Sequence, residues 1–353
     1  AVMGIIADRW IPAQRLLGLC HLFAAGFITL AATRTDYNSL YTLVLLSVMF
    51  YMPTIALSNS VAYNALEKAG LDTVTHFPPI RVWGTVGFIC AMWVVDLGKM
   101  GLSATQLYFS ATLGLILGLY SFTLPNCPIN RSGGGKSIVD LLGLRAFALF
   151  KQRKMAIFFI FSMLLGMSLQ ITNAFADGYI KSFGDTGIHG AKYLGTFGVE
   201  HSTILISLSQ ISETLCILLI PFFLKRFGIK RVMLIAMFAW VLRFALLGAG
   251  NPGPGVWMFI LSMIVYGVAF DFFNISGSLF VEKETSAAIR SSAQGVFMIM
   301  TNGLGALIGS YLAGWVVNHY GWPLSWYLFA GFSLVVAIVF AVIFKYKHDP
   351  NRI

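Results

Sequence analysis

Two carboxylates lie in the middle of long apolar stretches of this sequence. Asp271 is the single charged residue between about Val256 and Phe280, and Glu213 is the single one within 202–224. An ionisable group inside a lipid bilayer is costly unless it faces a cavity or a partner. Burial also favours the protonated form of a carboxylate, so such an acid could take up a proton on one side of a membrane and release it on the other.

Other polar and aromatic residues accompany these acids at helical spacing, in four apolar segments. Residues three or four positions apart share one face of an α-helix, so each segment is predicted to turn one polar stripe towards a common interior. The stripes are Arg81, Thr85 and Phe88; Gln170 and Asn173; Gln210 and Glu213; and Tyr266, Phe270, Asp271 and Asn274.

These side chains together suit a neutral, polar, partly aromatic solute. Amides and carboxylates hydrogen-bond hydroxyls and ring N–H groups, and aromatic faces stack on flat rings. Taken singly, the amides could instead join helices by hydrogen bonds, the aromatics could be packing, and Arg81 could anchor a helix at the membrane edge. Arg243 is a further cation, in the apolar segment 231–249. It is expected to snorkel or to pair structurally with a neighbour.

The elements that would position these residues are transmembrane helices. The chain has 353 residues, of which 58% are hydrophobic and 11% charged, and its mean hydropathy is +0.79. A helix needs about 20 apolar residues to span a bilayer, and roughly ten segments qualify. They are 16–33, 40–62, 80–98, 104–124, 155–176, 202–224, 231–249, 256–280, 292–317 and 324–344.

A polar link at 125–154 separates four of these segments from six. We therefore predict three regions: a helical half at 1–124, a cytoplasmic linker at 125–154 and a six-helix half at 155–353. Four against six is unequal, and two further helices before residue 1 would make twelve.

Basic residues predict the orientation, since loops on the cytoplasmic side are enriched in Lys and Arg. One set of alternate loops carries 18 of them and the other carries 4, which predicts a cytoplasmic C-terminus. This placement explains the net charge of +10 without nucleic acid.

Several other functions lack support in the sequence. "SGGGKS" at 132–137 resembles a P-loop, but Asn130 stands where that motif needs glycine. The four cysteines show no paired spacing, and no catalytic constellation or metal motif is visible. We expect neither an enzyme nor a bound cofactor or metal.

The opening segment resembles a signature of the major facilitator superfamily. In "GIIADRW", Gly4, Asp8 and Arg9 match the pattern Gly-x-x-x-Asp-Arg-x-Gly, while Ile11 replaces its last glycine. A degenerate copy, "PFFLKRFGIKR", begins at Pro221, where a second six-helix half would repeat the first.

The chain more closely resembles the bacterial nucleoside:proton symporters, the nucleoside permease family. The resembling stretches include "FPPIRVWGTVGF" (77–88), "IFFIFSMLLGMSLQITNAF" (157–175), "SLSQISETL" (207–215), "RFALLGAG" (243–250) and "SMIVYGVAFDFFNISGS" (262–278). The resemblance implies a major facilitator fold of twelve helices, of which about ten are present here and the N-terminal two are missing. It also implies a monomer in the bacterial inner membrane.

For function, the resemblance implies proton-driven import of purine and pyrimidine nucleosides by alternating access. It implies binding through residues at matching positions: Arg81, Thr85, Phe88, Gln170, Asn173, Gln210, Glu213, Tyr266 and Phe270. Asp271 and Glu213 are the candidates for proton coupling, and the sequence does not choose between them. The alternatives are a carrier of this fold for a sugar or drug, and a non-transporting membrane subunit.

Overall fold

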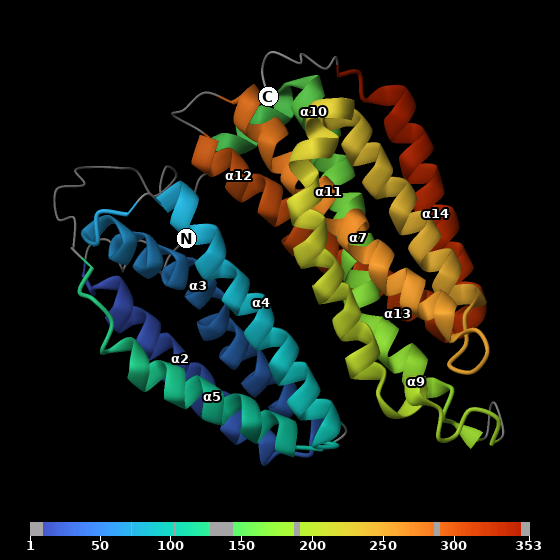
Figure 1. The fold of residues 1–353 in the computed structure, drawn as a ribbon, viewed down its shortest axis with the longest axis horizontal. Coiled ribbons are helices and arrows are strands. Elements are labelled where there is room, and N and C mark those ends of the chain that lie inside the picture. The colour runs from blue at the N-terminus through green and yellow to red at the C-terminus, as the bar shows by residue number, and fades with distance from the viewer. Residues whose placement is uncertain are drawn as a thin grey trace. The chain divides into compact units, whose positions relative to one another are not determined.

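The computed structural model describes residues 10–71, 73–101, 103–127, 144–186, 191–285 and 290–346. The chain divides into two compact units, residues 1–142 and 143–353, each coloured by position along the chain in Figure 1. The boundary falls within the predicted linker, whose residues 128–143 lie outside the described part, as do Gly4, Asp8 and Arg9 of the opening motif.

The first unit contains four described helices. They are α2 (Ala13–Ala32), α3 (Tyr37–Lys68), α4 (Thr73–Leu97) and α5 (Thr105–Ser121). Helix α2 packs against both α3 and α5. A Cβ on Gly18 would lie 2.9 Å from the Gly118 carbonyl oxygen, so this glycine lets the α2 and α5 backbones approach closely, as small residues do in membrane helix pairs.

Polar contacts fix the helix ends of the first unit. Asp36 caps α3 by accepting a hydrogen bond of 2.8 Å from the Ser39 backbone N–H, and this bond holds the pKa of Asp36 below its usual value. Gln14 donates to the Asn126 side chain at 2.6 Å and accepts from the Cys127 backbone N–H at 3.0 Å. The start of α2 is thereby tied to the chain that follows α5.

The second unit contains the remaining described helices. They are a 3₁₀ helix η1 (Leu144–Lys151), α7 (Arg153–Ser182), α9 (Phe197–Glu200), α10 (Ser202–Ala249), α11 (Val256–Glu284), α12 (Arg290–Met298), a π-helix η2 (Ile299–Gly305), α13 (Ala306–Tyr320) and α14 (Trp322–Ile343). Helix α10 packs along α11 and α14. The core of this unit is rich in buried aromatic rings, including Phe158, Trp240, Phe244 and Trp326.

Helix α10 is two helical segments joined at Gly228. That residue has φ 75° and ψ 165°, a left-handed φ that glycine adopts without steric cost. The break lies between the predicted segments 202–224 and 231–249, so each predicted segment corresponds to one of the two helical segments of α10. Lys230 beside it donates a 3.0 Å hydrogen bond to the Ala341 carbonyl of α14.

The described residues are helical and contain no strand, which confirms the predicted all-α class. Each of the ten predicted segments overlaps a helix. By length and composition alone, seven described helices could cross a membrane, one of them the long α10. The number of spanning helices stays a prediction.

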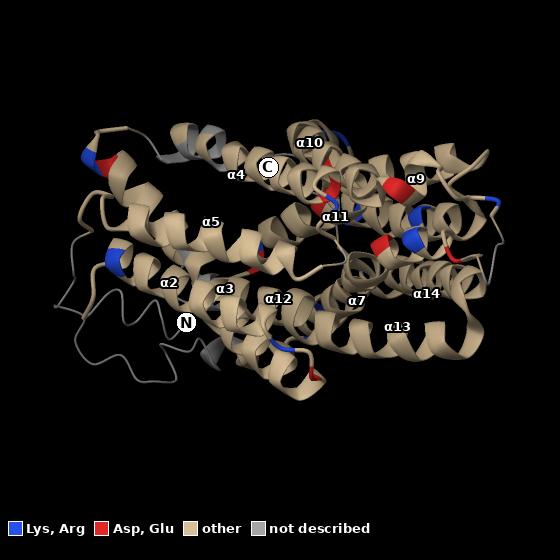
Figure 2. Ribbon diagram, turned by 90° about the horizontal axis from the view of Figure 1, so that it is seen from below, with Lys and Arg blue, Asp and Glu red and all other residues tan. Residues whose placement is uncertain are grey.

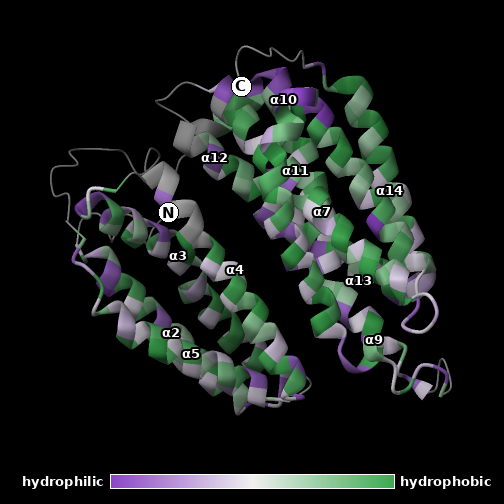
Figure 3. Ribbon diagram, in the orientation of Figure 1, coloured by the Kyte–Doolittle hydropathy of each residue, from purple (hydrophilic) through white to green (hydrophobic). Residues whose placement is uncertain are grey.

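The distribution of polar residues agrees with a membrane protein. Figure 2 shows few charged residues along the helices, which are mostly uncharged. Figure 3 shows hydrophobic residues along most of each helix, with hydrophilic residues more frequent towards the helix ends. This distribution leaves the few charged groups within the second unit as the features that need a functional explanation.

Candidate functional site

Four of the predicted site residues come together around Tyr266, from three helices. Tyr266 on α11 shares a side-chain hydrogen bond with Asn173 of α7, and it lies within electrostatic reach of Glu213 on α10 and of Asp271 on its own helix. We call Asn173, Glu213, Tyr266 and Asp271 the polar cluster. The structure therefore brings together members of three of the four predicted stripes.

Asp271 is the most enclosed acid of this cluster. It is 3% exposed, and its Oδ2 atom is buried with no hydrogen-bond partner among the described residues. Glu213 is half-buried and close enough to act electrostatically on Asp271. A buried carboxylate with no cation beside it in the described chain is costly when charged, so the site is suited to holding a proton.

The close packing of α10 against α11 brings the two acids within electrostatic reach of each other. Ser212, which precedes Glu213, donates a hydrogen bond to the Ile264 carbonyl oxygen. A Cβ on Gly267 would lie 2.6 Å from the Ser212 carbonyl oxygen. Glycine at 267 thus allows the backbones of α10 and α11 to approach closely beside Glu213.

Phe270 and Asn274 extend the site into a small, partly open cavity. The Tyr266 and Phe270 rings stack with centroids 5.8 Å apart and 18° between their planes. The cavity is also lined by Trp240 of α10 and by Thr301 and Asn302 of the π-helix η2. An aromatic wall with three polar side chains at its edge matches the chemistry of a flat, hydrogen-bonding solute.

Trp240, Thr301 and Asn302 are not among the residues predicted from the sequence. A signal was present, since "TNGLG" places two polar residues and two glycines inside the apolar segment 292–317. π-Helical turns are frequent at functional sites. This one lies against α7 at Gly166, where an added Cβ would come within 2.1 Å of the Thr301 carbonyl oxygen.

The other predicted residues are placed as follows. Gln170 on α7 and Gln210 on α10 are half-buried. In the first unit, Thr85 is half-buried and Phe88 is 54% exposed on α4. Arg81 lies in the backbone of α4, but its side chain is outside the described part. The roles of these five residues stay predictions.

Of the two expectations for Arg243, snorkelling to the membrane surface is wrong, and a structural pairing with neighbouring residues is what the structure contains. This side chain is 1% exposed, and its guanidinium carbon lies 4.6 Å from the centre of the Tyr266 ring. It donates a 2.5 Å hydrogen bond to the Ser262 carbonyl oxygen. Its position beside Tyr266 keeps the cation inside the helix bundle.

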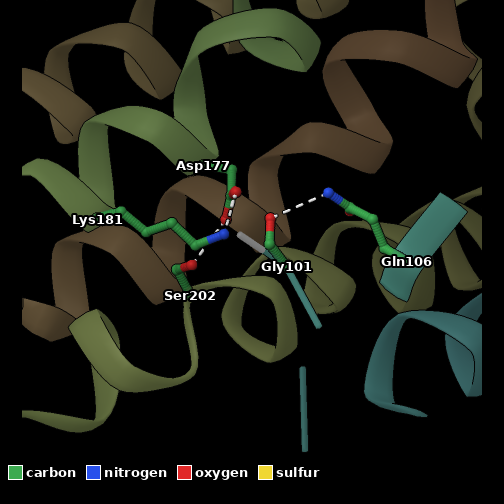
Figure 4. A network of polar contacts seen from close by, with 5 residues as sticks. All are labelled: Gly101, Gln106, Asp177, Lys181 and Ser202. Carbon is green, nitrogen blue, oxygen red and sulfur yellow. Dashed lines mark hydrogen bonds and ion pairs between the residues drawn. The ribbon is translucent and has the colours of Figure 1, made fainter. Parts of the chain in front are cut away.

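Two ion pairs lie at the two ends of α7, outside the polar cluster. At one end of α7, Asp177 pairs with Lys181 at 2.7 Å and accepts a 2.6 Å hydrogen bond from Ser202 at the start of α10, as Figure 4 shows. At the other end, Lys154 pairs with Glu284 of α11 at 2.6 Å. These ties fix α7 relative to α10 and α11. Among the described residues, no group of His, Cys, Asp and Glu side chains could hold a metal ion.

Comparison with known proteins identifies the family. The profile of the family described as "Nucleoside H+ symporter" matches residues 1–349. The chain belongs to the nucleoside:proton symporter family. Nucleoside permease NupG of Escherichia coli (strain K12) is 51% identical over 355 residues, which cover 99% of this chain and 84% of that protein. A xanthosine permease of the same organism is 50% identical over 359 residues, covering 100% of this chain and 85% of that protein.

Solved structures agree with this membership. The crystal structure of nucleoside transporter NupG superposes with a TM-score of 0.89 at 51% identity, covering 98% of this chain and 86% of that one. A peptide transporter at 14% identity and a TM-score of 0.70 shares the fold alone. This member of the symporter family is thus a multi-pass transporter of the bacterial inner membrane and not an enzyme.

Proposed function

We propose that this symporter binds its nucleoside at the polar cluster and couples import to a proton held by the Asp271–Glu213 pair. The observation that carries the proposal is the enclosed Asp271 carboxylate, 3% exposed, with Glu213 beside it and no described hydrogen-bond partner for one of its oxygens. In a transporter driven by protons, such an acid is the natural carrier.

The proposed roles follow from side-chain chemistry. Phe270 stacks on the base at the cavity wall. Tyr266, whose ring lies nearly parallel to that of Phe270, supports Phe270 and presents its hydroxyl to the nucleoside. Asn173, Gln170 and Gln210 hydrogen-bond the base edge and the ribose hydroxyls. Glu213 accepts from a hydroxyl and shares the proton with Asp271.

In the first unit, Arg81, Thr85 and Phe88 of α4 are proposed to contact nucleoside. We further propose that the carrier is a monomer, that its C-terminus is cytoplasmic, as the loop charges indicate, and that it accepts both purine and pyrimidine nucleosides.

Coupling follows from the cost of burying charge. An ionised Asp271 enclosed with a bound nucleoside would be unfavourable, so closure of the loaded carrier requires a bound proton. A proton gradient thereby favours the closed, loaded carrier on the side from which protons enter. Opening of the carrier towards the other side of the membrane then releases the proton and the nucleoside together. The empty carrier returns deprotonated, with water in place of the nucleoside to solvate the ionised acid.

The test is uptake by the purified chain in proteoliposomes. Labelled uridine and adenosine should accumulate under an imposed inward proton gradient, and a protonophore should abolish accumulation. Sugars in excess should not compete. If a sugar competed better than unlabelled nucleoside, the nucleoside assignment would be wrong.

A further inference from the structure

Arg243 is an enclosed cation that the proposed mechanism does not use. It is 1% exposed, and its Nε atom is buried with no hydrogen-bond partner among the described residues. Its described contacts are the Ser262 carbonyl oxygen at 2.5 Å, the Met263 sulfur at 3.8 Å and the Tyr266 ring at 4.6 Å.

This environment compensates the charge only partly. A buried guanidinium is costly unless it is paired and hydrogen-bonded, and no ion pair to Arg243 occurs in the described chain. A carbonyl, a thioether and an aromatic face remain to stabilise it. When desolvated, a cation over an aromatic face is attracted by the ring quadrupole, so Tyr266 is the strongest of these partners apart from the Ser262 carbonyl.

Arg243 and Ser262 are hydrogen-bonded to each other twice. Ser262 donates its hydroxyl back to the Arg243 carbonyl oxygen at 3.1 Å, so α10 and α11 are joined by two hydrogen bonds at this level. Trp240, one turn before Arg243, meets Tyr266 edge-on at 88° with centroids 6.0 Å apart. Tyr266 is thus held by a cation on its face and by an indole ring edge-on to it.

Tyr266 transmits this arrangement to the polar cluster. Its hydroxyl is hydrogen-bonded to Asn173 and lies within electrostatic reach of Glu213 and Asp271, and its ring stacks with Phe270 at the cavity. A cation over the ring also draws electron density from it, which makes the phenolic hydroxyl a stronger hydrogen-bond donor. Both effects act on the group that is proposed to meet the nucleoside.

We infer that Arg243 is a positioning residue for nucleoside recognition, which fixes and polarises Tyr266 and through it orders the stacked Tyr266–Phe270 pair. The inference rests on the proposed function of the polar cluster. It assigns no direct contact with substrate to Arg243.

The test is a double-mutant cycle on nucleoside uptake with R243M and Y266F. R243M keeps an unbranched, flexible side chain but removes the cation. We expect it to raise the KM for uridine by about tenfold, as loss of a desolvated cation–π contact would, with a smaller change in the maximal rate. Because Y266F removes the hydroxyl that the cation polarises, R243M should cost clearly less in that background.

A matched control uses another buried tyrosine of the same unit. The Tyr179 hydroxyl donates to the Leu247 carbonyl oxygen at 3.1 Å, outside the polar cluster. The effects of R243M and Y179F on KM should therefore add, as they do for independent sites. Additivity of R243M with Y266F as well would overturn the inference, because Arg243 would then act only through general packing.

Folding is checked by the melting temperature of each purified variant. If R243M does not fold, R243Q replaces it in the same cycle, since glutamine keeps a planar hydrogen-bond donor but lacks the charge. Wild-type-like KM in R243Q, or additivity with Y266F, would again contradict the inference. Absence of nucleoside uptake by the wild-type chain would instead contradict the proposed function.

Discussion

Replacement of Asp271 by asparagine should uncouple transport from the proton gradient. The amide would have nearly the same size as the native carboxylate but could not ionise, so the carrier would no longer need a proton to close. The native side chain is 3% exposed, and one of its oxygens has no described hydrogen-bond partner. The substitution therefore removes a buried charge without breaking a described contact, and the melting temperature should not fall.

The expected size of the effect follows from the two neighbouring acids. Two carboxylates that share a buried site do not readily ionise together, so the Asp271–Glu213 pair is expected to carry one proton per cycle. A driving force of about 100 mV is worth about 2.3 kcal/mol per charge, and about 1.4 kcal/mol corresponds to a tenfold concentration ratio. The wild-type chain should then accumulate uridine about fifty-fold at that driving force, and D271N about one-fold.

Two assays on the same proteoliposomes separate coupling from binding. Uptake against a gradient under an imposed proton-motive force should be lost in D271N, whereas exchange of internal unlabelled for external labelled uridine should continue. Accumulation by D271N at the wild-type level would refute the reasoning and assign the proton to Glu213. Loss of exchange as well would show that Asp271 is needed for binding or movement rather than for coupling alone.

Three further results are expected. F88A should raise the KM for uridine more than F222A, a change at a ring of similar exposure (60% against 54%) on α10; equal effects would make Phe88 a packing residue. N302A should change the ratio of uridine to adenosine uptake by about threefold to tenfold, the size of one lost hydrogen bond, and an unchanged ratio in a competition panel would remove Asn302 from the site. G166A should lower the melting temperature, because its Cβ would come within 2.1 Å of the Thr301 carbonyl oxygen. Such overpacking costs about 1–3 kcal/mol. A melting temperature equal to that of the wild-type chain would show that α7 and η2 can separate there without loss of stability.

Simple periodicity was enough to predict the helices and most of the polar cluster. Apolar runs of bilayer length have one structural solution, because helices alone satisfy the backbone within a single segment. Within those helices, the three-residue spacing of Gln210 and Glu213 predicted a shared face. The structure places Glu213, Tyr266 and Asp271 near one another, as the stripes predicted.

The rest depended on contacts that spacing does not encode. In the π-helix η2 the turn is wider than in an α-helix, so a 3.6-residue period does not say which face Asn302 occupies. The long side chain of Arg243 could reach either a membrane surface or a neighbouring helix. The observed position of the Arg243 side chain depends on Tyr266 and Ser262 of α11, which become its neighbours only when the helices pack.

Basic residues cluster around the break at Gly228. Lys225, Arg226, Lys230 and Arg231 fall within seven residues around it, at the point where the two segments of α10 meet. Near an anionic leaflet each such cation is worth about 1 kcal/mol, so together they would hold this bend at the level of the phosphates. Through the hydrogen bond from Lys230 to the Ala341 carbonyl, α14 would share that attachment to the membrane surface.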